Sequence, residues 1–286
     1  MAINKRYEFS VFFEVINGNP NGDPDAGNMP RIDPETGHGI VTDVCLKRKV
    51  RNYVELTRNL ASGYNIYVTE GAVLNEKQRR AYAAVRPKDA TAKELSPTKG
   101  TDEAKQLTEW MCDQFYDIRT FGAVMTTKIN CGQVRGPVQF TFARSIDPIF
   151  AQEVTITRQA VTQEGADKDK EMGRKHVIPY ALYRMNGYIS GYLAEKTHFS
   201  EDDLALLWES LSNLFEHDRS AARGEMTVRK LVIFEHSTNL GNAPAHTLFD
   251  RVQIERLTEY SARSFKDYRI AVDSHNLPTG VSLIEK

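Results

Sequence analysis

Three aspartates in a stretch rich in glycine and proline are the residues of this sequence that could carry out hydrolytic chemistry. Asp23, Asp25 and Asp33 lie between Asn17 and Gly39, a segment with five glycines and four prolines. Carboxylates that share a divalent metal ion can activate water for phosphodiester cleavage, so a metal-dependent ribonuclease is one hypothesis. Two of these aspartates precede proline, and Asp-Pro pairs commonly start turns. We therefore expect a structural role for them and no metal site.

The same stretch could also hold a ligand with its backbone. Its run NGNPNGD lacks the GK[ST] ending of a P-loop, so it gives little support for nucleotide hydrolysis. So many glycines and prolines exclude a helix or a central strand. The stretch is either a group of structural turns or a cradle for phosphates or bases. The candidate RNA-binding residues in and just after it are Asn19, Asn21, Arg31 and Thr42.

A helix is predicted directly after this loop, in the stretch TDVCLKRKVRNYVEL. Thr42 or Asp43 is the expected N-cap, because short polar side chains accept hydrogen bonds from the first helical turn. Apolar residues recur at helical spacing and predict a buried stripe. This stripe consists of Leu46, Val50, Tyr53 and Val54.

The opposite side of this helix carries Lys47, Arg48 and Arg51 within an arc of roughly 100°. The chain as a whole is balanced, with 37 Lys and Arg against 38 Asp and Glu, so the cluster is local. At a spacing of four residues we expect only Glu55 to neutralise it, by pairing with Arg51. Such a helix suits a nucleic-acid backbone, because its first N–H groups also attract phosphate. An ordinary solvated face is the alternative.

Strands and helices follow one another in an order typical of RNA-recognition folds. Strands are predicted at Tyr7–Ile16 and Tyr64–Glu70, and again in DIRTFGAVMT and GPVQFTFARSIDP. A well-patterned helix is predicted at Glu201–Phe215, before the strand VRKLVIFEHS. The resulting βαββαβ order predicts an α+β, ferredoxin-like fold in a single domain over residues 1–286.

Two long insertions interrupt this order. Residues from about 71 to 115 are helical and polar, and we expect them at the surface. Residues from about 150 to 180 read as a two-stranded excursion, whose far end carries the run EMGRKH. There Met172 lies beside Arg174, Lys175 and His176. An apolar wedge beside cations could separate stacked bases while holding phosphates, although a solvated hairpin tip is the alternative.

The remaining composition favours a cytoplasmic protein without a cofactor. The three cysteines are far apart and form no CxxC pair, so a zinc knuckle or a redox pair is not expected. No run approaches the roughly 20 apolar residues of a membrane helix. The histidines show no HExxH spacing, and no GxSxG elbow occurs. The sequence therefore gives catalysis little support.

Several long motifs together resemble a CRISPR backbone subunit. They are the opening strand with NGNPNGDPDAGNMPR, the VTDVCLKRKVRNY helix, DIRTFGA, GPVQFTFARSIDP and MGRKHVIPYALYR. The chain resembles, over nearly its whole length, the RAMP-superfamily protein that lines the guide RNA in Cascade surveillance complexes. Within that family it is most similar to the type I-C version.

The resemblance implies a hand-shaped, non-catalytic protein. An RNA-recognition palm would carry helical fingers and a β-hairpin thumb, in the two insertions described above. Copies would stack head to tail along the guide RNA beside the other Cascade subunits. Each thumb would fold over the RNA of its neighbour and displace one nucleotide, and the target DNA strand would pair with the guide between the thumbs.

The resemblance also assigns RNA contacts to particular residues. On the basic helix these are Lys47, Arg48 and Arg51. In a palm loop they are Gln133, Val134, Arg135 and Gly136. At the thumb tip they are Met172, Gly173, Arg174, Lys175 and His176. Type III relatives cut target RNA with an aspartate in the loop before the first helix, but the overall match is to a DNA-targeting type, so we expect no cleavage here.

Overall fold

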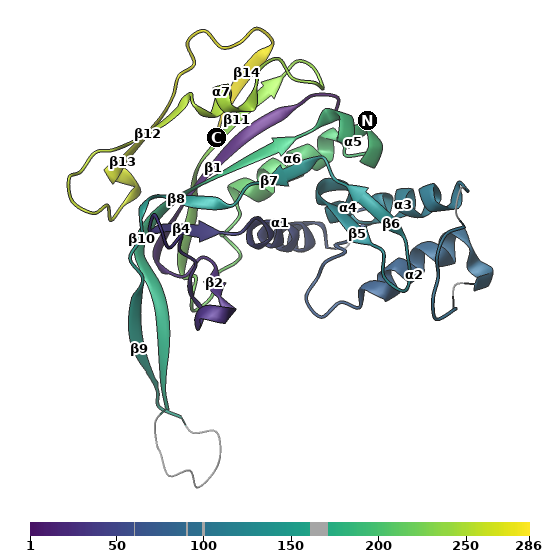
Figure 1. Ribbon diagram of the computed structural model, residues 1–286, viewed down its shortest axis with the longest axis horizontal. Helices are drawn as coiled ribbons and strands as arrows, with labels where there is room; N and C mark the ends of the chain where they lie inside the picture. The colour runs from purple at the N-terminus through teal and green to yellow at the C-terminus, as the bar shows by residue number, and fades with distance from the viewer. Residues whose placement is uncertain (60, 90, 99–100, 161–170) are drawn as a thin grey trace.

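An antiparallel sheet forms the centre of the molecule (Figure 1). The computed structural model describes residues 1–59, 61–89, 91–98, 101–160 and 171–286. The strands lie in the order β14-β11-β1-β10-β8-β4, and β7 and β9 also pair with β10. Their bounds are Tyr7–Gly18 for β1, His38–Val41 for β4, Val138–Phe140 for β7, Ala143–Pro148 for β8, Gln152–Arg158 for β9, Glu171–Ile189 for β10, Glu225–His236 for β11 and Val281–Glu285 for β14.

β1 lies inside the sheet, between β10 and β11, and both of its faces are covered. It pairs antiparallel with both neighbours, with Tyr7 opposite Ile189 on one side and Glu235 on the other. From Tyr7 to Val15 its odd-numbered side chains pack in one hydrophobic cluster, whereas Phe12 packs in another. A strand buried on both faces reads as a continuous run of aromatic and β-branched residues. The predicted strand at Tyr7–Ile16 is confirmed.

Two helices pack on one face of the sheet. They are α1, Asp43–Arg58, and α6, Glu201–Ser212. The predicted stripe of α1 is buried as expected, and three of its residues join the core cluster that contains Phe9 and Phe13. Thr42 is the N-cap of α1, as predicted, and accepts a hydrogen bond from the Cys45 N–H at 3.4 Å. The basic helix is therefore held firmly against the sheet.

The C-terminal part of the chain covers the opposite face. A second cluster there joins Phe12, Leu182 and Phe234 of the sheet to Leu248 and Tyr268. The covering elements are α7, Ala245–Phe249; β12, Val252–Arg256; η3, Phe265–Asp267; and β13, Tyr268–Val272. Both faces of the central sheet are thus occupied by protein.

A helical unit projects from one end of the sheet and has its own core (Figure 1). It comprises α2, Leu74–Val85; η2, Pro87–Asp89; α3, Glu103–Gln114; α4, Tyr116–Phe121; β5, Gly122–Met125; and β6, Gly132–Arg135. Its core contains Tyr82, Leu107, Met111 and Phe115, all fully buried. The helical, interrupted character predicted for residues 71 to 115 is confirmed.

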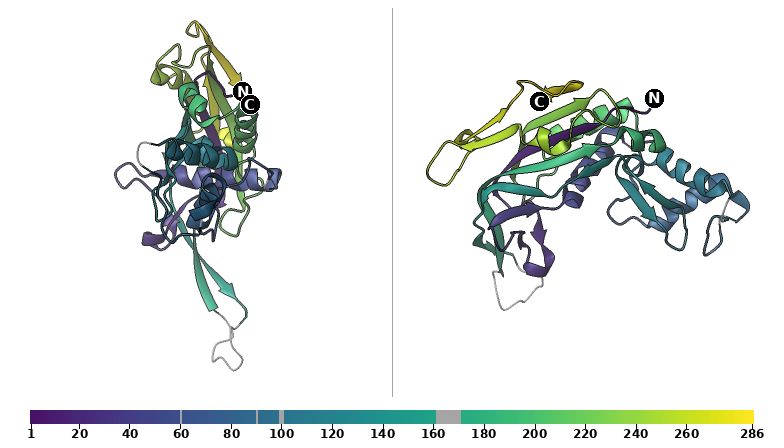
Figure 2. Two further views of the ribbon diagram at one scale, coloured as in Figure 1. Left: turned by 90° about the vertical axis from the view of Figure 1, so that its right-hand side faces the viewer. Right: turned by 45° about the horizontal axis from the view of Figure 1, so that its top comes forward.

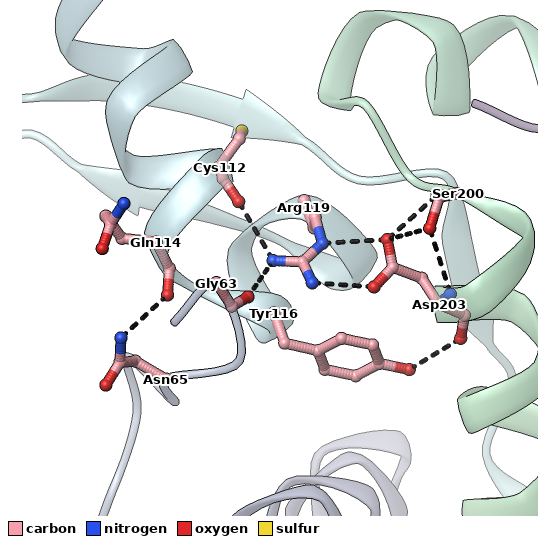
Figure 3. Close-up of polar contacts among 8 residues, drawn as sticks. All are labelled: Gly63, Asn65, Cys112, Gln114, Tyr116, Arg119, Ser200 and Asp203. Carbon is pink, nitrogen blue, oxygen red and sulfur yellow. Dashed lines mark hydrogen bonds and ion pairs between the residues drawn. The ribbon is translucent and has the colours of Figure 1, made fainter. Parts of the chain in front are cut away.

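Arg119 of α4 joins this helical unit to α6 (Figure 3). Its guanidinium donates two hydrogen bonds to the Asp203 carboxylate, Nε to Oδ2 at 3.0 Å and Nη2 to Oδ1 at 2.7 Å. It also donates to the carbonyl oxygens of Gly63 and Cys112. Asp203 in turn forms the capping box of α6 with Ser200. This buried, bidentate pair fixes the direction in which the helical unit leaves the sheet.

A two-stranded hairpin leaves the sheet in a different direction from the helical unit (Figure 1 and Figure 2). It is formed by β9 and the first part of β10, with Gln152 opposite Val177 at its base and Arg158 opposite Glu171 at its outer end. The hairpin falls within the excursion expected at 150 to 180. Strand β9 ends at Arg158, and residues 161–170 of the excursion lie outside the described residues.

Two predicted strands are wrong. Tyr64–Glu70 is not a strand and has a single bridge, from Asn65 to Phe115. The N–H groups of Tyr67 and Val68 donate instead to the Asp117 carboxylate. DIRTFGAVMT begins inside helix α4 and becomes a strand only at Gly122. All six residues of α4 are buried, so neither a helical nor a strand period is visible in them.

The glycine- and proline-rich loop holds two short paired strands and a 3-10 turn. These are β2, Gly22–Asp23; η1, Pro24–Ala26; and β3, Met29–Pro30. A further short helix, α5 at Gly191–Thr197, follows β10 directly. Across the described ranges, no helix is both long enough and apolar enough to span a lipid bilayer.

Candidate nucleic-acid interface

The loop before α1 is fastened to the start of that helix. Asn21 Oδ1 accepts hydrogen bonds from both the N–H and the hydroxyl of Thr42, each at 3.0 Å. The Thr42 hydroxyl oxygen accepts from the first turn of α1 as well. Asn21 and Thr42 were candidates for direct RNA contacts, but their polar groups are used to orient the loop on the helix. These bonds hold the loop against the start of α1.

Two other loop candidates are also engaged within the protein. Asn19 is 4% exposed and donates through Nδ2 to the Asn28 carbonyl at 2.7 Å, so it is not at the surface as a direct RNA contact requires. Arg31 is half-buried and donates through Nη1 to Asp23 Oδ2 at 3.2 Å. Asn19 and Arg31 are thus bound within the loop, which favours structural turns over a cradle formed by these two side chains.

The carboxylates of Asp23 and Asp33 serve separate turns, and Asp25 lies in the turn that Asp23 caps. Asp23 caps η1 by accepting from the Asp25 N–H at 3.2 Å. Asp33 accepts from the Glu35 N–H at 3.1 Å and from Arg144 at 3.0 Å, and these bonds lower the pKa of its carboxyl. Among the described residues, no group of three or more His, Cys, Asp or Glu side chains is placed to hold a metal ion. Asp23 and Asp33 form turns with their carboxylates, as expected.

Lys47 lies in a partly buried aromatic and polar setting at the end of the helical unit. Its ammonium is 2.9 Å from Asp43 Oδ2 and donates to Gln139 Oε1 at 3.3 Å. It also lies 5.6 Å from the centroid of the Phe121 ring and 6.0 Å from that of Phe140. Its side chain is only 12% exposed.

Arg51 is held even more firmly. Its Nε donates to Oδ2 of Asp117 at 2.8 Å, and its guanidinium carbon lies 5.4 Å from the centroid of the Phe121 ring. The expected pairing of Arg51 with Glu55 is wrong, because the acidic partner comes from α4 instead. The Asp43–Lys47 pair, at a spacing of four residues, was visible in the sequence and was overlooked.

Arg48 is the member of the predicted cationic trio that faces solvent. Its side chain is 48% exposed, and Nη1 lies 3.8 Å from the almost fully exposed Glu70. A pair of this kind contributes little to stability and is easily exchanged for a phosphate. The neighbouring Lys49 is buried against Asp218.

Three of the four candidates at 133 to 136 form part of strand β6, and Gly136 directly follows that strand. β6 pairs antiparallel with β5, which leaves Gln133 and Arg135 exposed and turns Val134 toward the core of the helical unit. Gly136 is buried, and a Cβ there would lie 2.3 Å from the Gly122 nitrogen, so this glycine permits close packing of two backbones. Only Gln133 and Arg135 of the four are placed to meet a ligand with their side chains.

Two hollows meet along β6. One is a groove of about 550 Å³ lined by Phe121, Gln139 and Val124 together with β6. Because Gln139 also binds Lys47, this groove adjoins the basic helix. The other is a pocket of about 820 Å³ on the side of α3 and α5. Phe121 and Gln139 were missed as site residues, since nothing in their sequence spacing links them to α1.

The hairpin candidates lie within β10 and not at the turn. Met172 pairs with Thr157 and is 80% exposed. Side chains alternate along a strand, so Met172, Arg174 and His176 share one face and Lys175 lies on the other. Arg174 Nη1 is 3.2 Å from Glu153 Oε1, whereas Lys175 donates to the Ala221 carbonyl at 2.9 Å. The expected cluster at the tip is therefore divided between two faces.

Comparisons with known proteins agree along nearly the whole chain. A family model described as CRISPR-associated protein Cas7 matches residues 5–273. A CRISPR-associated protein Cas7 from Haloferax volcanii is 24% identical over 301 residues, covering 95% of this chain and 82% of the relative. Among solved structures, a chain from a CRISPR RNA-guided surveillance complex, pre-nicking, is similar with a TM-score of 0.52 at 12% identity. That match covers 80% of this chain and 78% of the other, and indicates a common fold.

Proposed function

Since the chain belongs to the Cas7 family of CRISPR-associated proteins, we propose that it is a guide-RNA-binding backbone subunit of a CRISPR surveillance complex. The observation that carries this proposal is the extent of the family match, from residue 5 to residue 273. That range includes α1, β6 and the β9–β10 hairpin, the elements that carry the candidate RNA contacts. The type I-C version is the subtype we propose, on the sequence resemblance alone.

The sheet supports the description of the centre as an RNA-recognition palm. The chain runs from β1 through α1 to β8 with β10 between these strands, and from β10 through α6 to β11 with β1 between them. Two interlocked crossovers of this kind define the ferredoxin-like layout. RNA-recognition domains usually stack bases on an open sheet face. Here protein covers both faces, so we place the RNA at the end of the sheet, beside α1 and β6.

The two projections suit the roles of fingers and thumb. The helical unit has its own core and is joined to the palm through the Arg119–Asp203 pair, so we assign it as the fingers. We extend the expected range of about 71 to 115 through β6, because α4, β5 and β6 share that core. The β9–β10 hairpin, whose described β9 residues are all exposed, is the proposed thumb.

Further partners follow from this role. We propose that copies of the chain stack head to tail on the guide RNA, that other subunits complete the complex, and that a target DNA strand pairs with the guide. Many weak contacts with one continuous strand combine into tight binding. A cytoplasmic setting suits the three free thiols of Cys45, Cys112 and Cys131.

A metal-dependent ribonuclease is the less favoured alternative. Asp23 and Asp33 are each paired with an arginine, Arg31 and Arg144, and each accepts a backbone hydrogen bond. These contacts give both carboxylates a structural task. We therefore propose a non-catalytic subunit.

The test is the salt dependence of RNA binding. Arg48 and Arg135 are exposed, and replacing both with Ala removes two cations without disturbing a buried pair. The slope of log affinity for a single-stranded RNA against log salt should flatten by roughly 1.4. The matched control replaces Arg263 and Arg269, which are also exposed but belong to the C-terminal part of the chain, on the face of the sheet opposite α1. Equal slopes for the two double variants would contradict the assigned surface.

A further inference from the structure

The β9–β10 hairpin leaves the sheet at the point where β10 loses its inner neighbour. β1 ends at Gly18, which lies opposite Ile178 of β10. From Val177 outward the partner of β10 is β9, and the two strands continue as a ribbon as far as Glu171 and Arg158 (Figure 1). A two-stranded ribbon is only marginally stable in water by itself. The direction of this hairpin therefore depends on contacts at its base.

The loop between α6 and β11, residues 213–224, lies at this base. It leads into β11, whose first residue, Glu225, pairs with Ile16 near the end of β1. Just after β1, the N–H of Asn19 donates to the Ala222 carbonyl at 2.7 Å. The loop thus closes over the end of β1 and reaches toward β10, the other neighbour of that strand.

Lys175 connects the hairpin to this loop. Its Nζ donates to the Ala221 carbonyl at 2.9 Å, and its side chain is half-buried. Because the donor is an ammonium group, this hydrogen bond is assisted by charge. The neighbouring Arg174, on the other face of β10, is 72% exposed and pairs with Glu153 of the same hairpin. Arg174 therefore links the two strands of the hairpin to each other, whereas Lys175 links the hairpin to a separate segment.

The same loop is fastened to the basic helix. The Asp218 carboxylate forms an ion pair with Lys49 of α1, and both side chains are largely buried. It also accepts a hydrogen bond from Arg223 Nε at 2.8 Å. Within the loop, the backbones of Ser220 and Arg223 exchange hydrogen bonds of 3.3 and 3.0 Å. The path from Lys175 through Ala221 to Asp218 therefore joins the hairpin to α1 by a short, internally bonded stretch of chain.

We propose that Lys175 is a positioning residue, which fixes the direction of the hairpin relative to α1 through its bond to Ala221. The proposal rests on the proposed function and deepens it, since it gives Lys175 a role different from the RNA contact that the family resemblance implies. Both α1 and the hairpin carry candidate contacts for one RNA. The angle between them sets how far apart along the RNA those contacts fall, and a loosened hairpin would meet the RNA at variable positions.

The first experiment measures the hairpin direction in the full chain without RNA. Spin labels at Thr157→Cys on β9 and Ala205→Cys on α6, both exposed positions, report the distance between hairpin and palm by pulsed electron paramagnetic resonance. A Cys45→Ser background removes the half-buried native thiol, and the thiols of Cys112 and Cys131 are buried. Thermal unfolding of each variant checks that the fold is kept.

Three variants separate anchoring from a general effect of charge. Lys175→Met keeps the apolar stem but removes the donor, so the distance distribution should broaden or shift. Lys175→Arg keeps a charged donor and should retain the wild-type distribution. Arg174→Met is the matched control, since it removes a neighbouring cation that does not bind the loop, and it should also retain that distribution. A wild-type distribution in Lys175→Met, or equal broadening in Arg174→Met, would overturn the proposal.

The second experiment measures the affinity of the same variants for a single-stranded oligoribonucleotide at several salt concentrations. If Lys175 instead contacts a phosphate, Lys175→Met should flatten the slope of log affinity against log salt by roughly 0.7. That result together with an unchanged interspin distance would mean that the positioning role is wrong and the proposed function stands. If the wild type binds no RNA while Lys175→Met still alters the distance, the anchoring of the hairpin stands and the proposed function is wrong.

Discussion

Arg51 and Asp117 form an ion pair that joins the basic helix to α4, with Nε and Oδ2 2.8 Å apart and the Asp117 side chain 1% exposed. Asp117 also accepts the N–H groups of Tyr67 and Val68, so one carboxylate connects three segments of the chain. Arg51, which we expected on a solvated face of the helix, is therefore part of the structural framework.

Replacing Arg51 with Ala should destabilise the fold strongly. The variant leaves the Asp117 charge buried without its cation, which costs about 3 kcal/mol or more in the free energy of unfolding. Arg48→Ala, on the same helix, should change that free energy by less than about 0.5 kcal/mol, because Arg48 is exposed. Urea denaturation of both variants measures the difference. Equal stabilities would mean that the Arg51–Asp117 pair contributes nothing to the fold.

The position of this pair explains what could be predicted from the sequence. The N-cap at Thr42 and the buried stripe of α1 depend on residues within one or two helical turns, and both were predicted. The partner of Arg51 lies 66 positions away and becomes visible only when α4 is placed beside α1. Local spacing pointed to Glu55 instead. The tertiary fold decides which residues from distant segments pair with each other, and local sequence patterns carry no information on those pairs.

The secondary structure of Tyr64–Glu70 also depends on a residue that is distant in the sequence. Its aromatic and β-branched residues favour a strand, and Ile66 and Tyr67 are indeed buried. However, the Asp117 carboxylate takes the backbone N–H groups that a neighbouring strand would need. Met172 to His176 were expected to form one cluster at the tip of the hairpin. They lie in a strand instead, where alternation places neighbouring side chains on opposite faces.

The hairpin should affect base pairing through the face that carries Met172. If the hairpin displaces one guide nucleotide per copy, single mismatches in a target strand should be tolerated at a regular spacing. Met172→Ser should weaken that pattern, because it removes the exposed apolar side chain that would part the bases. Ile156→Ser, on the opposite face and 42% exposed, is the control and should preserve it. Binding of a mismatch-scanned target series measures both. A wild-type profile without periodicity would refute displacement by the hairpin.

The loop aspartates should not support cleavage. Purified protein should leave single-stranded and complementary RNA intact with magnesium or manganese, because Asp23 and Asp33 already pair with arginines. Gel analysis over hours checks this. Cleavage that is lost in Asp23→Asn, Asp25→Asn or Asp33→Asn would instead establish the ribonuclease hypothesis.

Alkaline pH should destabilise the core of the helical unit. Burial raises the pKa of Tyr67 and of Cys131 to about 12. The unfolded chain loses these protons first, near pH 8.5 to 10. The contribution of the two groups to stability is therefore fully present below that range and is lost as the pH rises toward 12. Between its pKa in the unfolded chain and its pKa in the folded protein, each group lowers the free energy of unfolding by about 1.4 kcal/mol per pH unit.

Unfolding followed by the fluorescence of Trp110, in a Trp208→Phe background, reports on this core, because Trp110 packs against it and is then the single tryptophan. Tyr67→Phe keeps the ring and removes the titrating hydroxyl, which has no partner among the described residues. This variant should lose less stability between pH 9 and pH 11 than its parent. An equal loss in both would show that Tyr67 does not carry the effect.

The RNA that co-purifies with the chain tests the central claim most directly. The tagged protein is expressed together with a CRISPR array and the other subunits of the complex, and the bound RNA is sized and sequenced. The account predicts RNA of uniform length that carries guide sequences, and a smaller yield for the Arg48→Ala, Arg135→Ala double variant than for the Arg263→Ala, Arg269→Ala control. RNA of random length and sequence, or no RNA above the background of an unrelated tagged protein, would contradict a role in lining the guide.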